Sequence, residues 1–221
     1  MVRGLDLHVK PGEVVAMLGP NGAGKSTTLL TVSGHLSPIN GTVVIDGERV
    51  TGKPHKVARR GLAHVLEGRS LFYGLTVREN LILGARRGGK SPDQILEIFP
   101  ALEPLLKRRA GLLSGGEQQM LSFGRAIASR PRVVLADEMS LGLAPVIVER
   151  MLPVLRELAD QEGTAVLLVE QHIQLALAIA DRGYVLNHGE VVHSGSAAEL
   201  VSNAAVLQSS YLGVEALPDL V

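Results

Sequence analysis

The stretch GPNGAGKST, residues 19–27, restricts how this chain can fold more than any other feature. It fits the pattern G-x-x-x-x-G-K-[ST], and it follows an apolar run, VVAML, and opens a helical pattern, KSTTLLTVSGHL. This strand–loop–helix context is the one that the pattern requires. Its glycines let the backbone aim N–H groups at phosphate oxygens, and the start of the helix adds a favourable field for an anion. The sequence therefore predicts a phosphate-binding loop (P-loop) between a buried strand and a helix.

Each residue type in this loop has an expected role. The Lys25 ammonium is expected to reach the β- and γ-phosphates of a nucleoside triphosphate, and the Ser26 hydroxyl to ligate Mg²⁺. The residues that we expect to contact the nucleotide here are Gly19, Pro20, Asn21, Gly22, Ala23, Gly24, Lys25, Ser26 and Thr27. The loop thus predicts a site for ATP and Mg²⁺.

A second apolar run, VVLADE at 133–138, ends in two carboxylates. Asp137 is positioned to hold Mg²⁺ through water. Glu138 suits a general base that polarises the attacking water, a role whose removal typically costs about 10²- to 10⁴-fold in rate. Taken alone, these residues are more simply interpreted as a solvated acidic pair at a strand end. The P-loop upstream instead favours the interpretation that Asp137 and Glu138 act in catalysis.

Composition excludes several classes of protein. Lys+Arg and Asp+Glu number 22 each among 221 residues, so a broad basic surface for nucleic acid is not expected. The absence of cysteine excludes disulfides and thiolate metal sites and fits a reducing cytoplasm. The longest unbroken apolar run, LALAIA, is far shorter than the roughly 20 residues of a membrane span, and the first residues lack a signal-peptide apolar region. We therefore expect a soluble, cytoplasmic protein that reaches a membrane only through a partner.

Short apolar runs alternate with helical patterns, which predicts an α/β fold with a mostly parallel core sheet. The expected strands are 14–18, 42–46, 62–66, 133–137 and 165–170, and the expected helices are 25–36, 92–107, 117–129, 146–162 and 172–182. The stretch YVLNHGEVVHSG predicts a hairpin that turns at residues 187–189. Because residues 75–128 show helical patterns without a convincing strand, we interpret them as a helical subdomain inserted into a nucleotide-binding core of residues 1–74 and 129–221. The whole chain, 1–221, is then one domain.

The stretch LLSGGEQQ at 112–119 allows two interpretations. Ser114 and Glu117 have the spacing of a capping box, so these residues could simply start a helix well, at about 1 kcal/mol for the cap. Alternatively, Gly115 and Gly116 leave backbone N–H groups unshielded for phosphate. The helix that follows leads directly into VVLADE, which favours the second interpretation.

With LSGGEQQ lying between a P-loop and a D-E strand end, the chain resembles the ATP-binding cassette (ABC) ATPases over essentially its whole length. The resemblance implies a P-loop NTPase fold, ATP hydrolysis, and two cassettes paired head to tail, either identical or different. It also implies that Ser114, Gly115, Gly116 and Glu117 contact nucleotide held by the partner's P-loop. The aromatic residue that stacks on adenine in this family would lie upstream of Met1, so we expect low nucleotide affinity.

Two further family positions can be placed by the resemblance. The glutamine-loop position falls on Glu67, where a carboxylate can still orient Mg²⁺ and water. The switch-histidine position falls on Gln171 when counted back from ADR, although His172 is its neighbour and stays an alternative. An amide at this position cannot take up a proton, in contrast to the usual histidine.

Several stretches together resemble the ATPase of branched-chain amino-acid importers, namely LEGRSLF, LTVRENL, SLGLAP and LVEQ. The resemblance implies membrane permease subunits as partners and, indirectly, a substrate-binding protein. It places the chain on the inner face of the cell membrane as a peripheral subunit. Phe72 and Tyr73 are candidate permease contacts, and packing in the core is the alternative for both. Importers of urea or amides are alternatives, as are a soluble ABC ATPase that acts on DNA or the ribosome and a P-loop kinase or GTPase.

Overall fold

The fold is built on a six-stranded sheet with the strand order β4-β5-β6-β1-β7-β8. The computed structural model describes residues 2–66, 70–85, 88–140 and 144–203. The strands are β1 (Val14–Leu18), β4 (Leu62–Val65), β5 (Val133–Asp137), β6 (Ala165–Glu170), β7 (Arg182–Asn187) and β8 (Glu190–Ser196). Neighbours pair in parallel except β7 and β8, which form the predicted hairpin. The expected mostly parallel α/β sheet is thus confirmed.

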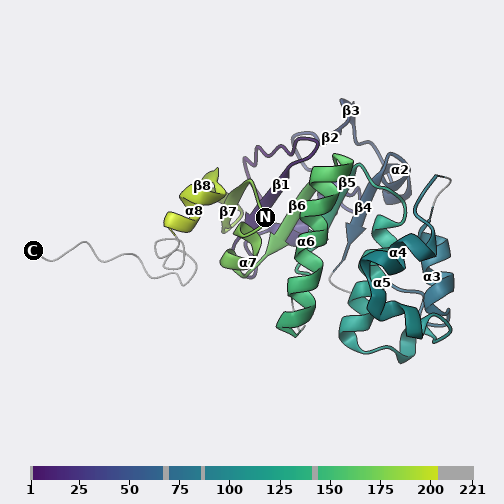
Figure 1. The fold of residues 1–221 in the computed structure, drawn as a ribbon. Helices are drawn as coiled ribbons and strands as arrows, with labels where there is room; N and C mark the ends of the chain where they lie inside the picture. Colours follow the sequence, from purple (N-terminus) through teal and green to yellow (C-terminus); the bar gives the residue numbers. More distant parts are fainter. Residues whose placement is uncertain (1, 67–69, 86–87, 141–143, 204–221) are drawn as a thin grey trace, which may run out of the picture.

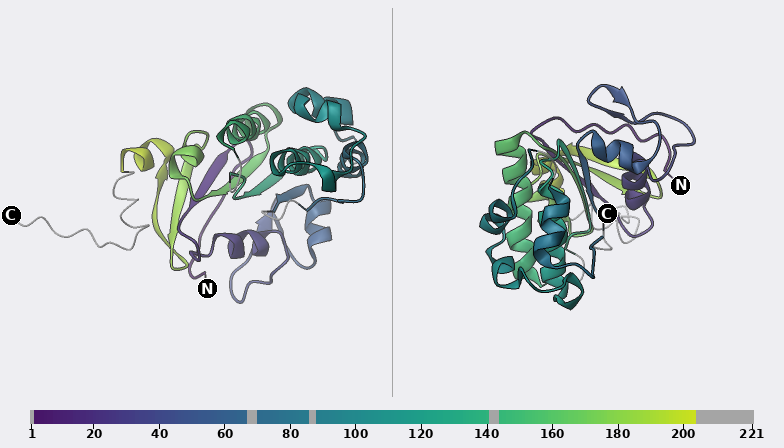
Figure 2. Two further views of the ribbon diagram at one scale, coloured as in Figure 1. Left: turned by 90° about the horizontal axis from the view of Figure 1, so that it is seen from below. Right: turned by 90° about the vertical axis from the view of Figure 1, so that its right-hand side faces the viewer.

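Helices cover both faces of this sheet, and the apolar strands β1, β5 and β6 are buried between them, whereas the edge strand β8 is largely exposed. The helices are α1 (Lys25–Val32), α2 (Pro54–Arg59), α3 (Val77–Gly84), α4 (Pro92–Ile98), α5 (Gly115–Ile127), α6 (Pro145–Glu162), α7 (Ile173–Leu177) and α8 (Ala197–Ser202), with 3-10 turns η1 (Pro100–Leu105) and η2 (Ala110–Leu112). One core joins the sheet to α3–α8, and a second joins it to α1 and α2. Figures 1 and 2 show the sheet between these two layers. None of the described helices is long and apolar enough to cross a membrane.

Three expected elements differ from those observed. Residues 42–46 do not join the main sheet, because Asp46 and Gly47 turn the chain with positive φ values of 53° and 76°. The short strands β2 (Val44–Ile45) and β3 (Glu48–Arg49) form a separate antiparallel pair there.

The expected helix over 92–107 is interrupted at Phe99, whose φ of −124° and ψ of 71° are not helical. Pro100 disfavours the helical conformation of the residue before it, so the chain continues as η1. The expected helix over 172–182 ends early, at Leu177, because Asp181 donates its N–H to Val14 O and Arg182 pairs with Val15 of β1.

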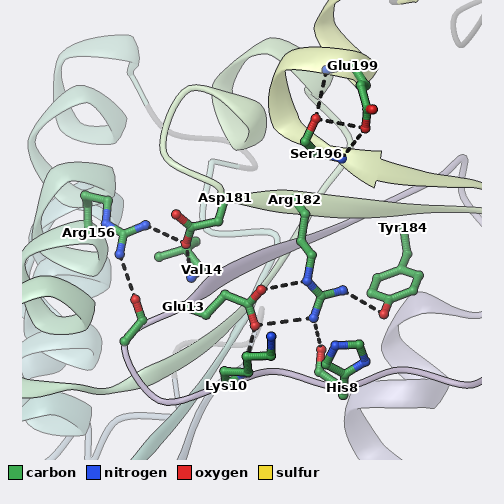
Figure 3. A network of polar contacts seen from close by, with 11 residues as sticks. His8, Lys10, Glu13, Val14, Arg156, Asp181, Arg182, Tyr184, Ser196 and Glu199 are labelled. Atoms are coloured by element: carbon green, nitrogen blue, oxygen red, sulfur yellow. Dashed lines mark hydrogen bonds and ion pairs between the residues drawn. The ribbon is translucent and has the colours of Figure 1, made fainter.

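Polar contacts tie together the amino-terminal ends of β1 and β7 (Figure 3). Arg182 donates to Glu13 Oε1 at 2.6 Å, to the Tyr184 hydroxyl at 2.7 Å and to the backbone oxygen of His8. Asp181 accepts from Val14 N and from Arg156 of α6, both at 2.8 Å. These contacts lie at the strand ends opposite those that carry Asp137 and Glu170, which are the last residues of β5 and β6.

Candidate nucleotide-binding site

The P-loop connects the carboxyl end of β1 to α1, as the sequence predicts. Gly24 is the N-cap of α1 with φ 104°, a left-handed conformation that a side chain would strain. A Cβ on Gly19 would lie 2.4 Å from Leu186 O, so only glycine allows the loop to approach β7 this closely. Gly189 N donates to Ala23 O at 3.0 Å, which anchors the loop to the β7–β8 turn.

The remaining loop residues lie at different depths. Asn21, Gly22, Ser26 and Thr27 are exposed, whereas Ala23 and Lys25 are buried. Lys25 is only 4% exposed, and its Nζ donates to Gly19 O at 2.8 Å and to Pro20 O at 3.1 Å. This ammonium is therefore held beneath the loop whose exposed rim would receive phosphate.

The strand-end carboxylates lie beside the P-loop lysine. Asp137 closes β5 and is 5% exposed. Glu138 follows with φ 44°, and its Oε1 lies 3.4 Å from Lys25 Nζ. Gln171 Nε2 donates to Glu138 Oε2 at 2.8 Å, so the two carboxylate oxygens of Glu138 have a cation on one side and an amide on the other.

Of the two residues considered for the switch position, only Gln171 contacts Glu138. His172 is exposed at the N-cap position of α7 and makes no side-chain capping bond there. The third predicted residue of this group, Glu67, lies outside the described residues.

The start of α5 forms the capping box that the first interpretation of LLSGGEQQ predicts. Ser114 Oγ accepts from Glu117 N at 3.4 Å, and Glu117 Oε2 accepts from Ser114 N at 2.7 Å, which completes the capping box. Gly116 packs against α6, since a Cβ there would lie 3.2 Å from Ile147 Cγ1. Within the described parts of the chain, no hydrogen bond or ion pair joins residues 114–117 to the P-loop.

Sequence reasoning missed one group beside this site. Glu170, the last residue of β6, is 1% exposed, and its carboxylate accepts from Ser140 N at 3.0 Å and from Ser140 Oγ at 2.5 Å. Burial raises the pKa of Glu170, although both Ser140 bonds favour its charged form. The only signal in the sequence was a glutamate that ends an otherwise apolar strand, LLVE, directly before Gln171.

Comparison with known proteins relates this arrangement to one family. The family model described as ABC transporter matches residues 2–140. The branched-chain amino acid transport ATP-binding protein BraG of Pseudomonas aeruginosa is 43% identical over 215 residues, which are 95% of this chain and 91% of BraG. The probable branched-chain amino acid transport ATP-binding protein LivF of Archaeoglobus fulgidus is 36% identical over 90% of this chain and 87% of LivF.

Solved structures agree with the sequence relatives. An ATP-binding subunit of an ABC transporter superposes with a TM-score of 0.82 at 28% identity, covering 96% of this chain and 92% of that one. The dimeric ATP-binding cassette MJ0796, bound to ADP and Pi in a post-hydrolysis state, superposes with a TM-score of 0.79 at 28% identity, covering 89% and 90%. This chain therefore belongs to the ABC transporter family, as one of its ATPases.

Proposed function

We propose that this chain is the ATP-hydrolysing subunit of an importer for branched-chain amino acids, bound to the inner face of the cell membrane from the cytoplasm. The similarity to BraG and LivF supports the choice of cargo, because both carry branched-chain amino acid transport in their names. The agreement extends over nearly the whole chain rather than the P-loop alone.

One observation supports the chemistry most strongly, which is the placement of Glu138 between Lys25 and Gln171. A carboxylate at this point can polarise a water molecule that attacks a phosphate held on the P-loop. Bound phosphate oxygens would compete with Glu138 and with the Gly19 and Pro20 carbonyls for the Lys25 ammonium. The hydrogen bond from the Gln171 side-chain amide would then keep the Glu138 carboxylate oriented.

The donor chemistry of the site also suits Mg²⁺, which prefers oxygen ligands and is commonly held by one or two carboxylates together with substrate phosphates. The Lys25–Glu138 pair brings their chain neighbours Ser26 and Asp137 to the same site. When bound, the ion would neutralise charge on the β- and γ-phosphates. Glu67 is proposed as a further carboxylate toward the ion.

We further propose that two such chains, identical or different, pair head to tail around ATP. The exposed Ser114 and the half-exposed Gly115, Gly116 and Glu117 at the start of α5 would then meet nucleotide held by the partner's P-loop. The dimeric form of MJ0796 supports this proposal. The starts of α1 and α5 in one chain would thereby contact two different nucleotides.

We assign residues 75–128 to a helical subdomain and residues 1–74 and 129–221 to the nucleotide-binding core. In favour of this division, the elements described from Val77 to Ile127 are all helical, and Phe123 of α5 packs on Phe99 with ring centroids 5.8 Å apart. Apolar side chains are exposed on and beside this part, which suits a permease contact. They are Phe72, Tyr73, Ile82, Leu83 and Leu112. The guanidinium carbon of Arg125 lies 5.1 Å from the centroid of the Phe72 ring, within the range of a cation–π contact.

The test is transport by the chain reconstituted in proteoliposomes with the membrane permeases that co-purify with it and their substrate-binding protein. We expect ATP-dependent uptake of leucine but not of urea, and Glu138→Gln should lower ATP hydrolysis at least about 10²-fold while ATP still binds. Uptake of urea instead of leucine would contradict the cargo, and full hydrolysis by the variant would contradict the chemistry.

A further inference from the structure

Three successive residues, Val169 and Glu170 at the end of β6 and Gln171 directly after it, hold the turn that follows β5. Val169 O accepts from Glu138 N at 2.9 Å, the Glu170 carboxylate accepts both donors of Ser140, and Gln171 donates to the Glu138 side chain. Glu138 is therefore held through both its backbone and its side chain, and Ser140 is held by the Glu170 side chain.

This turn needs such fixing because Glu138 has φ 44°, in the left-handed region that is unfavourable for a residue with a Cβ. A strained conformation persists only where surrounding contacts determine it. Met139 is 2% exposed and is packed in the core, but apolar packing does not orient the carboxylate of the residue before it. The two directed bonds to Ser140 are the described contacts that hold the far side of the turn.

A buried carboxylate at position 170 carries a desolvation cost that an apolar side chain would not. Glu170 is almost wholly buried, and this burial raises its pKa and disfavours the charged form. An apolar residue would fill the space more cheaply but would leave the Ser140 N–H and hydroxyl without these partners. A buried carboxylate at Glu170 is explained if its bonds to Ser140 set the geometry of the turn at residues 138–140 rather than add to the stability of the fold.

We propose that Glu170 is a positioning residue for ATP hydrolysis: its buried carboxylate holds Ser140 and thereby fixes the turn that aims Glu138 at the attacking water. This inference rests on the proposed role of Glu138 as the base. Glu170 itself does not touch nucleotide in this arrangement, so its loss should affect kcat and leave the binding of ATP to the P-loop intact.

The experiment measures steady-state phosphate release by the full-length chain, with its permeases where these are needed for turnover. We expect Glu170→Met to lower kcat by roughly 10- to 100-fold, the loss that follows a misplaced catalytic group, with the KM for ATP changed less than about twofold. Glu170→Gln should stay within about threefold of the parent, because its oxygen can accept from Ser140 N while its amide donates to the hydroxyl.

Thr164→Val is the matched control. Thr164 precedes β6 at the opposite end, is 1% exposed, and donates its hydroxyl to Pro131 O at 3.0 Å. Thr164→Val removes a buried hydrogen bond at the other end of the same strand, and its kcat should stay unchanged within about twofold. A kcat loss in this variant equal to that of Glu170→Met would overturn the proposal, since general loosening would then explain both.

A second pair of measurements separates positioning from folding. In a Glu138→Gln background, Glu170→Met should slow hydrolysis no further, because there is no base left to aim. An additional loss there, or a raised KM in place of a lowered kcat, would contradict the proposal.

If Glu170→Met does not fold, Ser140→Ala tests the same contact. It should lower kcat by roughly 3- to 10-fold at unchanged KM, and an unchanged kcat would contradict the positioning role of Glu170. Full activity of Glu138→Gln alone would instead refute the proposed function.

Discussion

Gln171 and His172 are neighbours in sequence, but only the Gln171 amide reaches Glu138. A hydrogen bond to a charged group contributes about 1.5–3 kcal/mol, so Gln171→Ala should lower kcat by roughly 10- to 100-fold. Gln171→Glu should lower it further, because a second carboxylate would face the first. Phosphate release at saturating Mg·ATP measures both. The exposed His172 supplies the control, and His172→Ala should remain within about twofold of the parent; an equal loss in His172→Ala would show that the amide contact is not what matters.

The residues of the site differ in how far sequence could locate them. The P-loop is encoded locally, by glycine spacing between a strand and a helix, and its position could be predicted directly. The contact of Glu138 with Lys25 and Gln171 depends on the strand order, because β6 lies between β5 and β1. No local pattern reports that order. The Glu170–Ser140 contact, between residues 30 positions apart, was therefore not predictable from spacing alone.

At the scale of elements, α5 begins with a capping box, and so do α3, α4 and α8. Ser91 at the start of α4 makes the same bond as Ser114, at 3.3 Å from Gln94 N. Ser91→Ala and Ser114→Ala should each lower the free energy of unfolding by about 1 kcal/mol. If the start of α5 also meets nucleotide, only Ser114→Ala should lower ATP hydrolysis, by about 10-fold. Denaturant titration and phosphate release on both variants make the comparison, and equal hydrolysis by the two would leave α5 with a capping role alone.

The elements that sequence predicted well are those whose periodicity and ends agree. Helix α6 was expected over 146–162 and runs from Pro145 to Glu162, because its apolar stripe is long and Gly163 ends it with a left-handed φ of 66°. Helices α2 and α8 were not predicted, since each has only six residues, and α3 was expected only as part of the helical stretch 75–128. Residues 42–46 read as a core strand from their valines, and only the Asp-Gly turn explains why they pair with β3 instead.

At the scale of the whole molecule, the Glu13–Arg182 contact joins the segment before β1 to the start of β7 (Figure 3). Burial alone would raise the pKa of Glu13, but its bonds to Arg182 and to Lys10 N outweigh burial and lower it below 4.5. The same balance, with Arg156 and Val14 N as donors, lowers the pKa of Asp181 below 3.8. Both carboxylates therefore bind protons more weakly in the folded chain than in the unfolded chain.

The unfolded chain then takes up more protons over the pH range just below these ordinary values, so the free energy of unfolding should decrease as the pH is lowered through this range. We expect the contribution of these two carboxylates to the free energy of unfolding to stay constant from pH 7 to about 5 and to decrease from about pH 5 toward pH 3. Glu13→Gln should be about 1 kcal/mol less stable at pH 7, because the remaining bonds to Arg182 lose their charge assistance while solvent partly screens the pair. The difference should shrink below about pH 4, where the parent also loses that charge. Urea titrations across this range, with the exposed Glu149→Gln as control, measure both effects. A gap between Glu13→Gln and the parent that persists unchanged at pH 3 would mean that packing, and not the ion pair, links these two strand ends.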